Sequence, residues 1–137
     1  MPANHNIHIP QGDTLNLHIL YQDEISNGID LTNHKARMQV RKSPTSSSYL
    51  LFVDSTPGLT YGITGSTGGI HLNVNKGNTG SQTGGILLVM GATATSFVPA
   101  GKHHYDLELE NTTDGSIRKL IYGSYDSQYD VTRWRLR

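Results

Sequence analysis

Apolar and acidic residues alternate most regularly in the last third of the chain, in the order Tyr105, Asp106, Leu107, Glu108, Leu109 and Glu110. A period of two residues is typical of a β-strand with one buried and one solvated face. Asp114 and Gly115 follow, and this pair favours the positive φ angles of a tight turn. The pattern predicts a β-hairpin whose second strand spans residues 115–123, with one further short strand at residues 130–133.

Two earlier segments show the same period. Residues 15–21 carry Leu, Leu, Ile and Tyr at every second position, which predicts a core strand. In residues 35–41 apolar side chains alternate with polar ones, so this segment is predicted as a strand with a basic outer face. Its polar positions are Lys35, Arg37, Gln39 and Arg41. Residues 6–9 and 49–53 are predicted as shorter strands, the first ended by Pro10.

The middle of the chain is rich in glycine and contains two similar segments, residues 66–72 and 81–88. Two copies are too few for a solenoid, which needs about three stacked units. We interpret them as two strands that are entered through similar Gly-Gly bends. Residues 75–95 are predicted to form an extended loop or hairpin insertion. The polar stretch 76–82 is expected to be an exposed loop, or an arm that becomes ordered against a partner.

Composition favours a single all-β domain. The length of 137 residues suits one hydrophobic core, and good helix formers are too sparse for several helices. We expect a β-sandwich of about seven to nine short strands over residues 1–132, with the Gly-rich segment in its middle. Residues 133–137 are expected to be a short basic C-terminal tail.

Charge and composition also narrow the choice of partners and compartment. The 11 basic and 11 acidic residues balance, so neither nucleic acid nor an anionic membrane is expected as a partner. The chain has no cysteine, which excludes disulfides and fits folding in a reducing cytosol. The N-terminus lacks the pattern of a signal peptide, and no apolar run approaches the roughly 20 residues needed to cross a bilayer.

No residue pattern predicts catalysis, a metal site or a cofactor. The seven histidines lack the spacing of zinc sites, and no serine or glycine motif of a hydrolase or phosphate-binding loop is present. Asp106, Glu108 and Glu110 lie on one strand face, which could suggest paired catalytic carboxylates. They are better explained as a solvated face, or as the partners of a basic strand in cross-strand or intersubunit ion pairs. We therefore expect a non-enzymatic protein in which charged strands form an assembly surface, through Lys35, Arg37, Arg41, Asp106, Glu108 and Glu110.

Aromatic residues gather near the C-terminus, at Tyr122, Tyr125, Tyr129 and Trp134. Tyrosine and tryptophan are favoured at protein interfaces, and they also stack against sugars. The cluster therefore predicts an interaction surface, with ordinary partial burial as the alternative. The tail that contains Trp134 could dock on a neighbouring subunit or remain solvated.

Eight short motifs occur in an order that resembles a family of tailed-bacteriophage virion domains, which includes the N-terminal domain of baseplate upper proteins and related tail, neck and fibre-attachment proteins. The motifs are QGDTL (11–15), GIDLT (28–32), MQVR (38–41), GIHL (69–72), PAG (99–101), YDLE (105–108), LIYG (120–123) and VTR (131–133). The resemblance implies an immunoglobulin-like antiparallel β-sandwich that serves in the virion as a symmetric, non-enzymatic building block.

The resemblance leads to a functional expectation. The protein would be a structural component of the tail, baseplate or neck, assembled in the bacterial cytoplasm and present in several copies as a homo-oligomeric ring that holds fibres or other virion proteins. The alternative is a carbohydrate-binding module for a host receptor, with the tyrosine and tryptophan cluster as its stacking surface.

Overall fold

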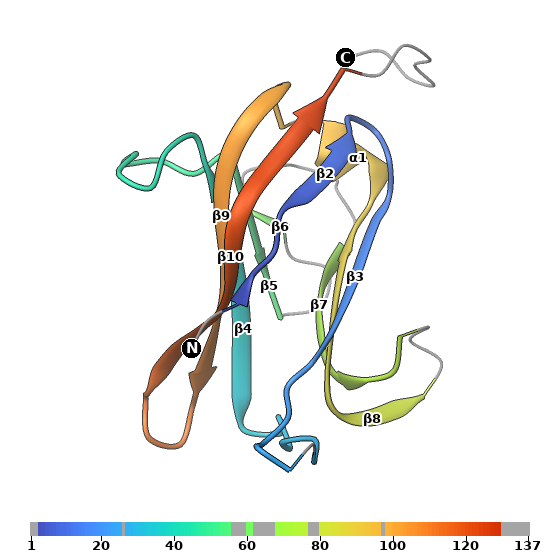
Figure 1. Cartoon of the computed structure of the whole chain (residues 1–137), viewed down its shortest axis with the longest axis vertical. Helices are drawn as coiled ribbons and strands as arrows, with labels where there is room; N and C mark the ends of the chain where they lie inside the picture. The colour runs from blue at the N-terminus through green and yellow to red at the C-terminus, as the bar shows by residue number, and fades with distance from the viewer. Residues whose placement is uncertain are drawn as a thin grey trace.

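Two β-sheets pack face to face and enclose the hydrophobic core (Figure 1). The computed structural model describes residues 3–25, 27–55, 60–61, 68–76, 80–96 and 98–129. In these residues the elements follow the order β1 (Ala3–Asn4), β2 (Ile7–Pro10), β3 (Leu15–Leu20), β4 (His34–Arg41), β5 (Leu51–Asp54), β6 (Thr60–Tyr61), β7 (Gly68–Val74), β8 (Ser81–Met90), α1 (Ala92–Ser96), β9 (Gly101–Asn111) and β10 (Ile117–Gln128). The predicted all-β sandwich is confirmed.

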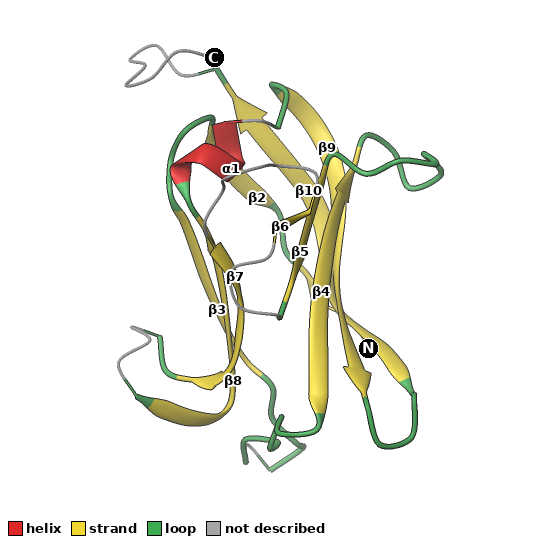
Figure 2. Ribbon diagram, turned by 180° about the vertical axis from the view of Figure 1, so that it is seen from behind, coloured by secondary structure: helices red, strands yellow, loops and turns green. Residues whose placement is uncertain are grey.

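The sheet topology is immunoglobulin-like. The larger sheet has the order β1-β10-β9-β4-β5-β6, with β2 also paired to β10, and the smaller sheet has the order β3-β8-β7 (Figure 2). If β3 to β10 are named B, C, C′, C″, D, E, F and G, the sheets are G-F-C-C′-C″ and B-E-D, the variable-type arrangement. One detail differs from a purely antiparallel sandwich, because β1 and β2 pair with β10 in parallel.

The core follows the period-two alternation. On β4 the inward residues Ala36, Met38 and Val40 are at most 2% exposed, whereas their neighbours on the strand are half-buried or, at Lys35, exposed. The inward residues of β9, β8 and the other strands complete one cluster that joins both sheets. Burial of each large apolar side chain contributes about 1.5–3 kcal/mol, so the alternation fixes which face of each strand points inward.

Residues 75–95 differ from the predicted insertion. The hairpin between β7 and β8 is present, but residues 81–90 form β8, the central strand of the smaller sheet. Ile86, Leu88 and Met90 are fully buried in the core. The interpretation of residues 66–72 and 81–88 as two strands is confirmed for the described residues by β7 and β8. The glycines of the second segment are not a bend that enters the strand, because Gly84 and Gly85 lie inside β8 where other backbone approaches too closely for a side chain. A Cβ atom on Gly85, for example, would lie 2.0 Å from the carbonyl oxygen of Val74.

The predicted C-terminal hairpin is confirmed as β9 and β10, which are antiparallel neighbours. Gly115 has a φ of 78° in the turn between them, as the Asp-Gly pair predicted. The register shifts between Lys119 and Ile121, where β10 contains a bulge. The predicted short strand at residues 130–133 and the predicted tail at 133–137 lie outside the described residues.

Candidate functional site

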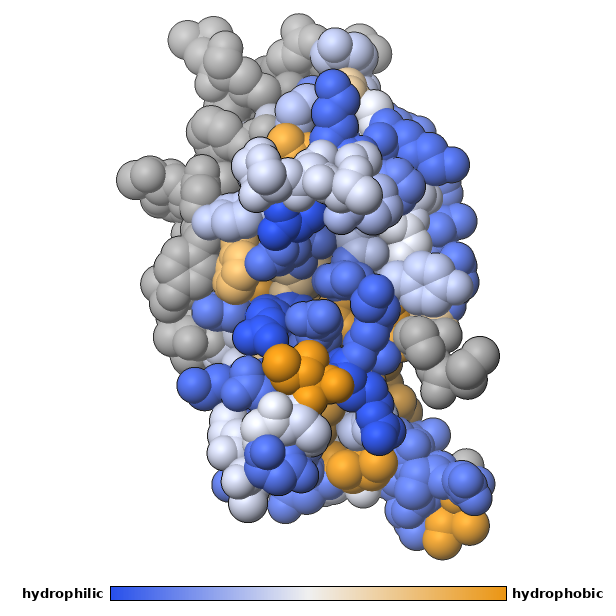
Figure 3. Space-filling model, turned by 90° about the vertical axis from the view of Figure 1, so that its left-hand side faces the viewer, coloured by the Kyte–Doolittle hydropathy of each residue, from blue (hydrophilic) through white to orange (hydrophobic). Residues whose placement is uncertain are grey.

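The outer face of the larger sheet gathers most of the charged residues that the sequence singled out. In the register of β4 and β9, Lys35 lies opposite Glu110, Arg37 opposite Glu108, Gln39 opposite Asp106 and Arg41 opposite His104. Lys119 and Tyr122 join them from β10, which is the next strand. We call this set of residues the charged face. Figure 3 shows that this side of the molecule is mainly hydrophilic, with apolar groups in separate small areas.

Arg37 links two carboxylates of the acidic strand. Its Nε atom lies 3.3 Å from Glu108 Oε1, and its Nη1 atom lies 3.4 Å from Glu110 Oε1. The cross-strand contact predicted from the sequence is therefore confirmed at Arg37. All three side chains are about one-third exposed, so each ion pair contributes on the order of 0–1 kcal/mol and stays accessible to a partner.

Arg41 has a different environment from the one expected. Its Nε and Nη2 atoms donate to Gln39 Oε1 at 3.1 and 2.6 Å, and its Nη1 atom donates to the carbonyl oxygen of Ser46 at 2.8 Å. These acceptors are neutral, because the register places Arg41 opposite His104 and not opposite a carboxylate. Arg41 thus holds the loop that follows β4 against the charged face, and the prediction of an acidic partner for it is wrong.

Lys119 is a member of the charged face that sequence reasoning missed. Its Nζ atom lies 3.3 Å from Asp106 Oδ2. A bulge follows Lys119 and places it on the same face as Tyr122, although the two residues are three positions apart, and the position of a bulge cannot be obtained from strand periodicity. The outward position of His104 could be predicted from the sequence, because His103 continues the inward series of Tyr105 and Leu107, and adjacent residues on a strand face opposite ways. The structure agrees, since His103 is buried and His104 is exposed.

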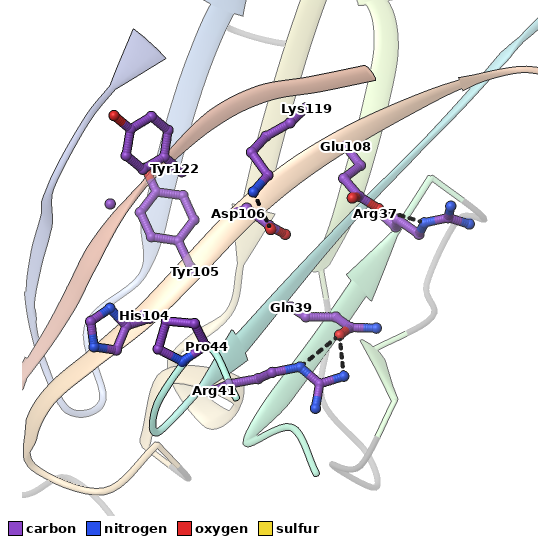
Figure 4. Close-up of a pocket in the computed structure, with 11 residues that line it drawn as sticks. Arg37, Gln39, Arg41, Pro44, His104, Tyr105, Asp106, Glu108, Lys119 and Tyr122 are labelled. Atoms are coloured by element: carbon purple, nitrogen blue, oxygen red, sulfur yellow. Dashed lines mark hydrogen bonds and ion pairs between the residues drawn. The ribbon is translucent and has the colours of Figure 1, made fainter. Parts of the chain in front are cut away.

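A shallow groove of about 350 Å³ runs across the charged face. Figure 4 shows Tyr122 and His104 at one end and Arg37 with Glu108 at the other. The ring of Tyr122 is 40% exposed, and Pro44 from the loop after β4 contributes a second apolar surface. The groove therefore combines paired charges along most of its length with a small apolar end.

The predicted aromatic surface is only partly present. Tyr122 and Tyr129 are exposed, but Tyr125 has no exposed surface and belongs to the core. The physical reason is the period of the strand, because Tyr122 and Tyr125 are three positions apart on a part of β10 without a register shift, and so point to opposite faces. The prediction is wrong for Tyr125, and Trp134 lies outside the described residues.

Among the described residues, four ionisable groups have perturbed pKa values, each with a structural cause. Burial raises the pKa of Tyr105 to about 12 and also raises the pKa of Tyr125. Hydrogen bonds from Thr32 lower the pKa of Asp30, and hydrogen bonds from Ser116 lower the pKa of Asp114. The tyrosines stay neutral at physiological pH, and the aspartates stabilise loops.

The chemistry available in the described part of the chain is that of polar recognition. No three His, Cys, Asp or Glu side chains of the described residues are grouped to hold a metal ion. In the same residues, no helix has the length and apolar character needed to cross a membrane.

A scan against protein-family models and a search of curated proteins found no match to this chain.

Proposed function

We propose that the protein is a non-enzymatic structural protein of a tailed-phage virion, located in the tail, baseplate or neck, where several copies hold fibres or neighbouring virion proteins. One observation carries the proposal. Residues 105–108 and 120–123, the strongest part of the resemblance to virion domains, pair with each other in β9 and β10. These two segments supply Asp106, Glu108 and Tyr122 to the charged face.

The charged face suits assembly contacts. Positive and negative side chains alternate over three adjacent strands, and the ion pairs of Arg37 and Lys119 remain partly exposed. Such a surface gives register and specificity more than raw affinity, because each charge must meet its complement on the partner. Weak contacts of this kind become durable when several copies bind at once in a symmetric particle.

Quantitative mass spectrometry of purified particles tests the proposal. We expect the protein at a fixed copy number per virion, after assembly in the host cytoplasm. The variant Glu108→Lys should lose incorporation while its circular dichroism spectrum stays that of a folded β protein. The matched control is Glu24→Lys, the same charge change on an exposed loop outside the charged face. Absence of the wild-type protein from particles would refute the virion role, and normal incorporation of Glu108→Lys would refute the use of the charged face.

The second candidate is a carbohydrate-binding module, and the groove is the observation that favours it. The exposed Tyr122 could stack against a sugar, while Asp106 and Gln39 line the same groove and carry the polar groups that bond sugar hydroxyls. Binding would then survive in the isolated monomer, and Tyr122→Ala would abolish it, with Trp134→Ala as a second test. Under the assembly proposal, titration calorimetry with glycans should show no sugar affinity.

A further inference from the structure

The strand β3 forms an open edge of the smaller sheet. It pairs with β8 on one side, over residues Leu15 to Leu20, and no described strand pairs with its other side. In the views from the front and from behind, β3 is the outermost strand of its layer (Figure 1, Figure 2). Its backbone N–H and C=O groups on that side are therefore available to another strand.

The side chains along this edge are incompletely covered. Leu15, Leu17 and Ile19 point toward the core and pack against it, yet all three remain partly exposed. The equivalent inward positions on β4 are at most 2% exposed. Leu20 on the outer face is 42% exposed. An apolar seam thus runs along β3, as expected for a sheet that lacks one neighbouring strand.

β3 also lacks the features that usually keep an edge strand from pairing. Its sequence Leu-Asn-Leu-His-Ile-Leu contains no proline and no charged Lys, Arg, Asp or Glu, and its register with β8 runs without a bulge. The opposite edge strand, β7, is interrupted by a register shift next to Asn73, which has a φ of 58°. In the larger sheet, β1 and β2 cover much of the β10 edge.

We propose that β3 pairs antiparallel with β3 of a second copy of this chain, about a two-fold axis, so that two three-stranded sheets become one continuous sheet. A second copy is the partner that this edge fits, because an uncharged strand meets itself without like-charge repulsion. This proposal does not depend on the virion role, since it concerns only the edge of the smaller sheet.

The alternation of side chains restricts the register. Residues directly opposite each other must lie on the same face of the continuous sheet, and a slip by one residue would put core positions opposite solvent positions. The register that centres Leu17 on Leu17 of the second copy satisfies this rule. It places Leu15 opposite Ile19 on the inner face and Asn16 opposite His18 on the outer face, so apolar residues meet apolar ones and polar residues meet polar ones.

Cysteine cross-linking tests the register, because the natural chain contains no cysteine. Directly opposed cross-strand residues are close enough for a disulfide. Leu17→Cys should form a disulfide-linked dimer under mild oxidation at a rate on the order of ten-fold above that of Asn16→Cys, whose thiol is more exposed but would lie opposite His18. Equal rates for the two variants would overturn the proposed register.

Wild-type protein tests the association itself, independently of how well Leu17→Cys folds. A single strand pair is a small interface, so sedimentation over roughly 10 to 500 μM should show the mass rise from the monomer value of 15.0 kDa toward twice that value. The β3 amides should gain hydrogen-exchange protection over the same range. Asn16→Lys should abolish both effects, while His71→Lys on β7, the other edge, should not. A mass that stays monomeric throughout, or a dimer unaffected by Asn16→Lys, would overturn the proposal.

Discussion

The hydroxyl group of Tyr105 donates a 2.6 Å hydrogen bond to the backbone carbonyl oxygen of His5. His5 lies on the far side of β10, the strand that pairs with Tyr105. His5 lies between β1 and β2, so this bond fastens the N-terminal segment to β9 across the intervening strand. Gly123 is the residue of β10 that pairs with Tyr105. The bond therefore passes over a position that has no side chain.

Removal of the Tyr105 hydroxyl should weaken the attachment of the N-terminal segment. Tyr105→Phe leaves the ring in place but deprives the His5 carbonyl oxygen of its donor, so the free energy of unfolding should fall by about 1–3 kcal/mol. Chemical denaturation at neutral pH measures the loss, and hydrogen exchange should show it locally in β1 and β2. An unchanged stability would mean that water replaces the hydroxyl group at no cost.

The same side chain predicts a loss of stability in alkali. Burial raises the pKa of Tyr105 from 10.0 to about 12, so the folded protein holds the phenolic proton more tightly than the unfolded chain. This contribution to stability is complete below pH 10 and is lost as the pH rises toward 12. Tyr105→Phe should therefore show a flatter decline of unfolding free energy above pH 10 than wild type, with the remaining slope due partly to Tyr125, whose pKa burial also raises. Parallel curves for the two proteins would contradict this assignment.

Gly123 should not tolerate a side chain. A Cβ atom there would lie 2.2 Å from the carbonyl oxygen of His5 and 2.8 Å from Asn6 Oδ1. Gly123→Ala must displace the N-terminal strands from β10, and we expect a loss of about 2–4 kcal/mol in thermal or chemical unfolding. Gly80→Ala is the matched control, because its nearest neighbour, Asn75 Nδ2, would be at an ordinary 3.5 Å. Similar stabilities for the two variants would show that the N-terminal segment moves aside easily.

Asn73 ties the loop before β4 to β8 of the smaller sheet. Its Oδ1 atom accepts hydrogen bonds from the backbone N–H groups of Leu31 and Gly84, both at 3.1 Å, and its Nδ2 atom donates to Asp30 at 3.0 Å. Asn73→Ala should cost about 2–4 kcal/mol, since it leaves two amide groups without their acceptor and keeps a positive φ. Asn73→Gly should be about 1 kcal/mol less damaging because glycine accepts that φ. Equal losses would show that the side-chain hydrogen bonds alone determine the effect.

The ion pair between Arg37 and Glu108 should be weak and sensitive to salt. A double-mutant cycle with Arg37→Met and Glu108→Gln should give a coupling of about 0.5 kcal/mol, because both groups are about one-third exposed. The coupling should fall toward zero in roughly 1 M salt. A cycle between Arg41 and Glu108 is the control, since Arg41 bonds to neutral acceptors. A large coupling that persists in high salt would be inconsistent with this partly solvated geometry.

Strand periodicity predicted much of the charged face. The alternation in residues 35–41 and 105–110 separated core positions from outward ones, and the structure confirms that Arg37 contacts the acidic strand. The same period already excluded a common surface for Tyr122 and Tyr125, because three residues separate them. Clustering along the sequence was the wrong criterion for that aromatic surface.

Two features of β8 and β10 could not be predicted, because they depend on backbone that is far away in the sequence. Local composition made Gly84 and Gly85 look like a bend at the start of a strand in an insertion, whereas they lie inside a central strand where neighbouring backbone leaves no room for Cβ atoms. Lys119 and Tyr122 share the charged face because a bulge in β10 lies between them, and bulges are set by strand pairing over the whole sheet.

Residue composition and periodicity were enough to identify an all-β chain, to identify the buried faces of its strongest strands, and to assign the outward charges to a basic and an acidic strand. These properties are local, because side chains on a strand alternate whatever the strand pairs with. The folded chain was needed to show that those two strands are neighbours, that the N-terminal strands pair with β10 in parallel, and that β3 is left as an open edge. Strand order and register arise from contacts between segments far apart in the chain, and local periodicity contains no record of them.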